Sequence, residues 1–342
     1  MSVAVVDPFD AARDPALPTV ARALDPDGVA RAFRHLTRLT GTEGAAQLRA
    51  IRVARHKLGR RCVIEYDLDI ARDGGTERVT LIGKIRVARF GKSGYRLLSA
   101  FWDAGFDASC GDGVSVPEPI ATVGAFQMWL QRKVPGIPAT RALAAPDGAR
   151  LAPRIAEAAH KIHRAGVATN ERHGIADELR ILAECFARVA AAEPRYGARL
   201  RALLAACERL AAGTTPSPAT GIHRDFYADQ ILVDGERLYV VDFDLYCAGE
   251  PALDVGNFIA HLTEQSVREL GRPDALADRE RALEERFVEL TGEDARARVH
   301  AYATLTLARH IYLSTTFPER RPFTAALLEL CEERVGAAAA VR

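Results

Sequence analysis

The chain has 342 residues, of which 48% are hydrophobic and 27% are charged. These proportions are ordinary for globular proteins and exclude fibrous and wholly disordered classes. The 46 basic and 45 acidic residues leave a net charge of +1, which gives no electrostatic footprint for nucleic acid. No apolar run approaches the roughly 20 residues of a membrane span, and we see no secretory signal at the N-terminus. The length predicts one large or two modest domains.

The six cysteines are scattered along the chain, without a CxxC pair or a spacing typical of metal ligands. We interpret them as small buried side chains in a reducing compartment, and we therefore expect a cytoplasmic protein.

A small sheet domain is predicted at the start of the chain. The first 25 residues, rich in Pro and Asp, should form an irregular lead-in, and a helix over 27–40 should follow with Asp27 as its N-cap. A second short helix is expected over 94–106. Runs that alternate apolar and polar residues, with turn signals between them, predict five strands. The predicted strands are residues 47–56, 62–70, 77–89, 117–123 and 125–131.

The character of the sequence changes at residues 134–138, where Pro and Gly mark a boundary. We therefore expect an N-terminal domain over 1–132 and a helical domain over 133–342, with a hinge near 129–136. The second part is rich in Ala, Leu and Arg at helical spacing. Its predicted helices are residues 149–165, 175–191, 195–212, 254–270, 276–290, 293–316 and 323–338.

One segment, residues 221–246, interrupts these helices. Two short apolar runs flank Asp234-Gly235 and predict a β-hairpin. Asp225 lies just before the hairpin and Asp242 at its exit, so the hairpin holds two carboxylates at a fixed separation, and Gln230 adds an amide oxygen. Mg²⁺ prefers oxygen ligands and usually takes one or two carboxylates together with substrate phosphates. A second carboxylate nearby can accept a proton from an attacking hydroxyl, so the pattern favours phosphoryl transfer.

The order of these motifs resembles a known fold. Residues 223–225 (HRD), Gln230 and residues 241–244 (VDFD) are similar to the catalytic loop and metal-binding motif of the protein-kinase-like fold. Residues 249–254 (GEPALD) resemble a motif of the aminoglycoside phosphotransferase family. The resemblance covers roughly residues 30–330. It implies an α+β, bilobal fold, with a small antiparallel-sheet N-lobe and a mainly helical C-lobe, and ATP and Mg²⁺ as cofactors.

The resemblance also implies roles for residues of the second domain. Asp225 would be the catalytic base or the group that orients the hydroxyl, and Gln230 and Asp242 would hold Mg²⁺. Asp254 would brace the backbone of the catalytic loop. We expect His223 to pack beneath that loop as a core histidine. Asp244 either contacts metal or substrate or faces solvent.

In the first domain, the resemblance places the phosphate-binding lysine of the family at Lys84, in the middle of a strand. The alternative is a lysine on an edge strand that points to water. The loop of residues 56–61, with Gly59 and Arg60, lies where the family covers the nucleotide phosphates, but its basic residues are equally consistent with a solvated hairpin tip.

The adenine site is inferred from position alone. Val63 and Ile82 would sandwich the base, although core packing explains both side chains equally well. The backbone from Trp129 to Gln131 would meet the adenine edge at the hinge.

The sequence departs from the family at three places. Gln230 stands where the family usually has Asn, and Asp244 stands where protein kinases have the glycine of the DFG motif. The helix over 94–101 has no acid to pair with Lys84, and Asp103 is the nearest candidate.

We expect an ATP-dependent phosphotransferase that moves the γ-phosphate to a hydroxyl of a small molecule. The acceptor would be a sugar, an amino alcohol, an aminoglycoside-like compound or a natural-product metabolite. We expect no nucleic-acid or membrane partner. The alternatives are a nucleotide-binding pseudokinase with a regulatory or scaffolding role, and transfer of another part of the nucleotide such as AMP. The acceptor, the choice between ATP and GTP, and the oligomeric state stay open.

Overall fold

The structure is a computed structural model that describes residues 3–34, 36–40, 46–72, 75–87 and 92–340. The chain forms two compact units, Met1–Pro135 and Gly136–Arg342. Within the described residues, no helix combines the length and the apolar character needed to cross a membrane. All six cysteines are free thiols, and five of them are buried.

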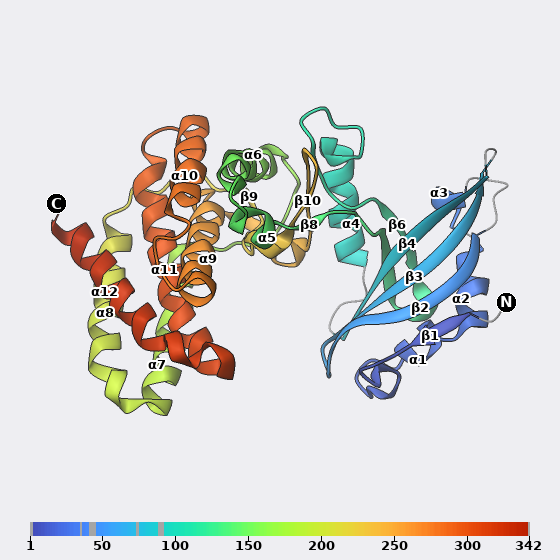
Figure 1. The fold of residues 1–342 in the computed structure, drawn as a ribbon, viewed down its shortest axis with the longest axis horizontal. Coiled ribbons are helices and arrows are strands. Elements are labelled where there is room, and N and C mark those ends of the chain that lie inside the picture. Colours follow the sequence, from blue (N-terminus) through green and yellow to red (C-terminus); the bar gives the residue numbers. More distant parts are fainter. Residues whose placement is uncertain (1–2, 35, 41–45, 73–74, 88–91, 341–342) are drawn as a thin grey trace. The chain divides into compact units, whose positions relative to one another are not determined.

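The first unit is built on a six-stranded sheet, in which the long strands β2, β3 and β4 lie side by side (Figure 1). Its strands, in sheet order, are β1 (Ala4–Val6), β2 (Ala46–Lys57), β3 (Arg61–Arg72), β4 (Gly75–Arg86), β7 (Met128–Arg132) and β6 (Pro119–Val123). The five predicted strands are therefore confirmed, with shifted ends. The expectation of an irregular lead-in is wrong, because β1 pairs in parallel with β2 and extends the otherwise antiparallel sheet.

One face of this sheet carries the core of the first unit. Every second residue of β3 is buried against α1 (Val20–Ala23) and α2 (Pro26–Phe33), including Tyr66, whose hydroxyl donates to the backbone oxygen of Ala23 at 3.0 Å. The N-cap of α2 is Asp25, which accepts from the N–H of Gly28 at 2.9 Å. The prediction of Asp27 is wrong because Pro26, favoured at the first helical position, starts the helix earlier.

The predicted helix over 27–40 is also shorter than expected. It ends at Phe33, and a separate turn of helix, α3 (Thr37–Thr40), follows. The helix predicted over 94–106 is α4 (Lys92–Phe101), which continues as a π-helical turn over Trp102–Phe106. The short strand β5 (Val114–Ser115) comes next in the chain.

The second unit is mainly helical, and each predicted helix is present. They are α6 (Leu151–Arg164), α7 (Ile175–Ala192), α8 (Gly197–Ala212), α9 (Ala252–Leu270), α10 (Ala277–Thr291), α11 (Ala295–Thr316) and α12 (Thr324–Ala340), with a further short helix, α5 (Ala139–Ala144). Helices α9 and α11 pack closely, because a Cβ added at Gly256 would lie 2.6 Å from the Cβ of Tyr302. The core of this unit lies between α7, α8, α9, α11 and α12.

The predicted hairpin is confirmed within this helical unit. Strands β10 (Ile231–Asp234) and β11 (Arg237–Val240) pair antiparallel across a two-residue turn, and Gly235 has the positive φ of 55° that such a turn needs. Strand β8 (Ile137–Pro138) pairs with β10, and β9 (Thr220–Ile222) pairs with β12 (Cys247–Gly249). The hairpin therefore starts and ends within a framework of paired backbone.

Candidate active site

Asp254 holds the loop that precedes the hairpin. Its carboxylate accepts from the backbone N–H groups of His223 at 2.9 Å and Arg224 at 2.7 Å, and it bonds Nε2 of His163 at 2.9 Å. Asp254 is fully buried near the start of α9. Arg224 has a φ of 68°, a left-handed conformation that is costly for a residue with a side chain. The bonds to Asp254 stabilise this conformation, in keeping with the bracing role expected for it.

A second set of side chains, not singled out from the sequence, supports the same loop. Asn257 donates to the backbone oxygen of Phe226 at 2.9 Å and accepts from Arg309 at 3.2 Å. Arg309 also bonds Glu178 at 3.2 Å, and Glu178 in turn bonds His173 at 2.6 Å. The only sequence signal for this network is that Asn257 lies one helical turn after Asp254.

Asp225 and Gln230 are brought together by the turn between them. Gln230 Nε2 lies 3.4 Å from Asp225 Oδ2, so the amide oxygen is the atom turned away from Asp225. Gln230 is buried, and its backbone oxygen accepts from the N–H of Val241 at 2.9 Å. This bond places Gln230 beside the chain that leads into Asp242.

Asp242 ends the hairpin with a φ of 66°, the left-handed region that a residue with a side chain rarely adopts. Burial and the negative charge of Asp242 raise the pKa of Asp225, while His223 opposes the shift. The residue before Asp242, Val241, bonds both Gln230 and His223 through its backbone, and Gln230 contacts Asp225, so the start and the exit of the hairpin lie beside each other.

His223 and Asp244 lie in different environments. The ring of His223 is fully buried, its Nε2 lies 3.0 Å from the oxygen of Val241, and it packs on Phe243 with ring centroids 4.8 Å apart. His223 is therefore part of the core below the loop, as predicted. Asp244 is exposed.

Five nucleotide-site residues predicted in the first unit share one face of its sheet. In the register of β3, β4 and β7, Val63, Lys84 and Trp129 lie opposite one another, as do Glu65, Ile82 and Gln131 in the neighbouring row. Opposite residues point to the same face, which is the face turned away from the core described above. Val63 and Ile82 are only half-buried there.

Lys84 lies on a central strand, since β4 has neighbours on both sides, so the alternative of an edge strand is wrong. Its Nζ is 5.0 Å from the centroid of the Trp129 ring. A cation over an aromatic ring gains about 0.5–2 kcal/mol. A Cβ added at Gly94 of α4 would meet the same indole at 3.1 Å, so this helix packs on Trp129. Asp103 is exposed.

The backbone that was predicted to meet the adenine edge is already hydrogen-bonded within the sheet. Strand β7 pairs on both edges, so the backbone from Trp129 to Gln131 lies in sheet ladders, and Lys133 N–H donates to the oxygen of Thr80 at 2.8 Å. An adenine edge would therefore have to meet the chain after Lys133.

The loop between β2 and β3 is tied to the N-terminal segment. Gly59, with a φ of 66°, donates its N–H to Asp14 at 2.8 Å, and His56 Nε2 bonds the same carboxylate oxygen at 2.8 Å. The Gly59 amide that would meet a phosphate thus already has an anionic acceptor. The side chain of Arg60 is exposed.

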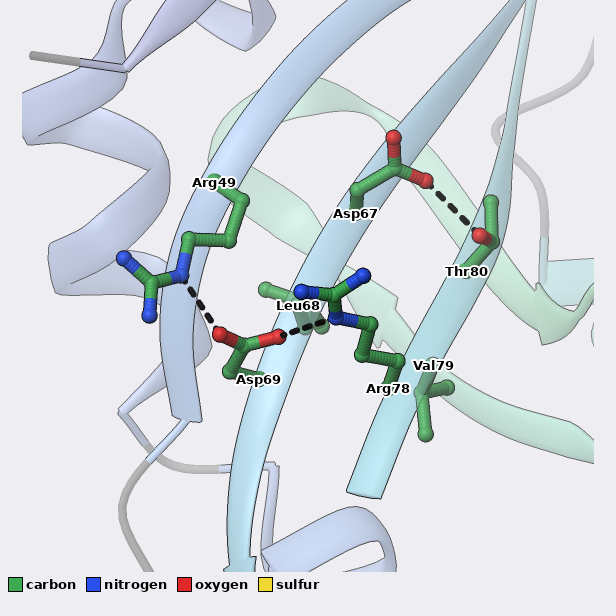
Figure 2. Close-up of a pocket in the computed structure, with 7 residues that line it drawn as sticks. All are labelled: Arg49, Asp67, Leu68, Asp69, Arg78, Val79 and Thr80. Carbon is green, nitrogen blue, oxygen red and sulfur yellow. Dashed lines mark hydrogen bonds and ion pairs between the residues drawn. The ribbon is translucent and has the colours of Figure 1, made fainter. Parts of the chain in front are cut away.

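Farther along the sheet face, a pocket of about 540 Å³ is lined by charged residues (Figure 2). Asp69 bonds Arg49 at 2.6 Å and lies 3.7 Å from Arg78, and Asp67 accepts from the hydroxyl of Thr80 at 2.7 Å. Because these groups bond one another, the pocket is an ion-pair network on the sheet.

Among the described residues no group of three or more His, Cys, Asp or Glu side chains could hold a metal ion by itself. The donor set at the hairpin, two carboxylates and one amide oxygen, instead suits Mg²⁺, which binds few protein ligands and completes its shell with water and phosphate oxygens. The residues present therefore fit the expected ion.

Comparison with known proteins identifies the family to which the chain belongs. The model of the phosphotransferase enzyme family matches residues 93–302. The match covers more than half of the chain, and the protein belongs to this family. No curated protein sequence matches the chain.

Solved structures with low sequence identity share the fold. A choline/ethanolamine kinase family protein from Mesorhizobium loti is 15% identical over 90% of this chain and 94% of its own, with a TM-score of 0.51. A putative aminoglycoside phosphotransferase from Ralstonia eutropha is 13% identical over 90% and 98%, with a TM-score of 0.57. A glucosamine kinase, solved with glucosamine, ADP and inorganic phosphate, is 18% identical over 93% and 87%, with a TM-score of 0.56. The α+β fold of the protein-kinase-like class is thus confirmed.

Proposed function

We propose that this phosphotransferase moves the γ-phosphate of ATP to a hydroxyl group of a small molecule. The observation that carries the proposal is the loop held by the buried Asp254, on which Gln230 contacts Asp225 and bonds the backbone of Val241, the residue before Asp242. Phosphoryl transfer depends mainly on positioning and on neutralising charge, and this arrangement supplies a fixed carboxylate beside oxygen ligands for a metal.

Asp225 aligns the acceptor hydroxyl and accepts its proton as the oxygen attacks the γ-phosphorus and ADP leaves. Asp242 and the amide oxygen of Gln230 would hold Mg²⁺, which would neutralise charge on the phosphates. In the first unit, Lys84 binds phosphate oxygens, and Val63 and Ile82 pack on the base. The side chains of these three residues point to one sheet face, which supports this assignment.

The acceptor is a small hydroxylated compound: a sugar, an amino alcohol, an aminoglycoside-like compound or another natural product. The glucosamine kinase and the aminoglycoside phosphotransferase with the same fold support this range. Around the catalytic loop, acidic side chains such as Glu178 are paired with Arg309. This pairing favours an acceptor with few positive charges over a polycation.

The test is an ADP-release screen of hydroxylated metabolites and antibiotics, followed by mass analysis of the product. Asp225→Asn should lower kcat at least about 100-fold, since general-base contributions are of this size or larger. Asp242→Ala should lower kcat by a similar factor, because it removes a ligand of the ion that neutralises charge on the phosphates. Both variants should keep the far-UV circular dichroism of the wild type. Asp234→Asn, at the exposed end of β10, is the matched control and should keep full activity. Retained turnover in both site variants would contradict the proposal, as would a wild-type protein that binds MgATP but transfers nothing. An adenylylated product would replace the proposal with AMP transfer.

A further inference from the structure

The helical unit contains a cavity of about 690 Å³ that the proposed function does not use. Its walls are mostly apolar and come from five helices, with Leu210 of α8, Ile259 of α9, Ala277 of α10, Ala297 of α11 and Ala337 of α12 among the lining residues. Cavities of roughly 300–1,000 Å³ with apolar walls and a few polar groups are typical of small-molecule sites.

This cavity lies on a different face of α9 from the catalytic loop. Asn257 bonds Phe226, and His261 stacks on Tyr227 with ring centroids 4.5 Å apart, so both face the loop. Ile259 lines the cavity instead. Since residues two positions apart point about 200° apart around a helix, the helix separates the two sites.

A buried carboxylate lies in the cavity wall. The side chain of Glu280 is only 15% exposed, and its Oε1 accepts from the hydroxyl of Thr263 at 2.7 Å. Arg334 is 4.0 Å from Oε2 of Glu280 and donates instead to the Thr263 hydroxyl at 2.8 Å. No cation among the described residues therefore has a hydrogen-bonded contact with this carboxylate.

A neighbouring acid in the cavity wall, Glu284, differs from Glu280 in its cationic partners. Glu284, one turn along α10, bonds Arg296 at 3.0 Å and His300 at 2.8 Å, and these partners lower its pKa. Burial raises the pKa of Glu280 to about 7 although Arg334 opposes the shift. Glu284 thus has two hydrogen-bonded cationic partners, whereas the nearest cation to Glu280, Arg334, stays 4.0 Å away.

We propose that this cavity binds an organic cation whose ammonium group pairs with Glu280 and whose hydrocarbon body fills the apolar walls. An ammonium group supplies the hydrogen-bonded positive partner that Glu280 lacks. A neutral alcohol would leave the carboxylate without a hydrogen-bonded cation, and an organic anion would be repelled by it. The ligand class is therefore a primary amine with an aromatic or aliphatic body.

The probe is 4-phenylbutylamine, with 4-phenylbutanol and 4-phenylbutyrate as neutral and anionic analogues of the same shape. Isothermal titration of the full chain at about pH 8, where Glu280 is ionised, should show the amine binding at least about tenfold more tightly than either analogue. Equal affinity for the alcohol, or no binding of the amine, would overturn the proposal.

Three variants locate the site. Glu280→Gln should weaken the amine at least about tenfold. Glu285→Gln removes the same charge from an exposed position on α10 and should bind as the wild type does. Ala297→Trp, at an exposed position of the wall, should fill the cavity and abolish binding. Circular dichroism checks that each variant is folded. Unchanged affinity in Glu280→Gln or Ala297→Trp would overturn the assignment.

The pH dependence separates pairing with Glu280 from simple apolar binding. The groups that face this carboxylate are Arg334 of α12, Thr263 of α9, and Arg281 and Glu284 of α10, with His300 of α11 beyond Glu284. Since the ammonium favours the ionised carboxylate, the affinity should fall as the pH drops through about 7. The fall should persist in His300→Gln and disappear in Glu280→Gln. A pH dependence that follows His300 instead would refute the pairing.

Discussion

The substitution Asp254→Asn tests whether the catalytic loop depends on one buried carboxylate. The two oxygens of Asp254 accept from His223 N–H at 2.9 Å, Arg224 N–H at 2.7 Å and His163 Nε2 at 2.9 Å. Asparagine has almost the same shape but replaces one oxygen with an NH₂ group. In either orientation of the amide, a donor then faces at least one backbone N–H.

The magnitude follows from these contacts. Leaving a buried donor without an acceptor costs about 1–3 kcal/mol, and the hydrogen bonds to the remaining oxygen lose the strengthening that a charged acceptor gives. In the orientation that turns the NH₂ group toward Arg224, this residue at a φ of 68° would also lose the bond that stabilises its left-handed conformation, which by itself costs about 1–2 kcal/mol. We expect the free energy of unfolding of the helical unit to fall by about 2–5 kcal/mol in total.

Urea denaturation followed by circular dichroism measures this loss, and ADP release with an identified acceptor measures the effect on turnover. We expect kcat to fall about 100-fold, because the loop that positions Asp225 relaxes. Asp234→Asn is the control, since it makes the same chemical change at the exposed end of β10, next to the turn of the hairpin. A change in stability below about 0.5 kcal/mol with normal turnover would refute the reasoning.

Three further predictions concern other parts of the chain. Gly83→Ala should destabilise the first unit by about 1–3 kcal/mol in urea denaturation, because its Cβ would lie 2.3 Å from Met128 Sδ; an unchanged midpoint would contradict this packing. Asp14→Ala removes the acceptor of Gly59 N–H and should speed trypsin cleavage in loop 57–61, whereas equal rates would show that the loop is held otherwise. The pKa of Glu280 is raised from 4.5 to about 7, so the protonated form is favoured in the folded state. The raised pKa of Glu280 therefore stabilises the folded state fully when the pH is below 4.5, the pKa of this group in the unfolded chain. This stabilisation is lost as the pH rises through about 7. Relative to Glu280→Gln, the free energy of unfolding of the wild type should fall by up to about 3 kcal/mol between about pH 5 and about pH 8. Curves of stability against pH that run parallel for the two proteins would disprove this prediction.

The residues that the sequence predicted well are those whose signals are local. The pair Asp234-Gly235 marks the hairpin turn, because Gly235 supplies the positive φ that the turn needs, and Asp225 and Asp242 lie on either side of this hairpin. Asp254 lies in a contiguous motif at the start of a helix. Helical periodicity likewise located all seven predicted helices of the second unit.

The contacts that the sequence did not reveal join distant segments. Asp14 bonds His56 and Gly59 across more than 40 positions of the chain, and nothing in the lead-in marks it as the anchor of that loop. Arg309 and Glu178 are one Arg and one Glu among many on amphipathic helices, and only the packing of α7 against α11 brings them together. Periodicity predicts which face of a helix is buried, but it cannot predict which residue of another helix that face will meet.

Lys84 shows why the absence of an acid on the following helix does not by itself argue against phosphate binding. The sequence placed the lysine on a strand, but only the register sets Trp129 directly opposite it, with Nζ 5.0 Å from the ring centroid. A Cβ added at Gly94 of α4 would lie 3.1 Å from the indole, so the helix packs on the ring. An aromatic face attracts a cation without neutralising it. The contact with Trp129 therefore helps to orient Lys84 on the sheet face without an acid on α4.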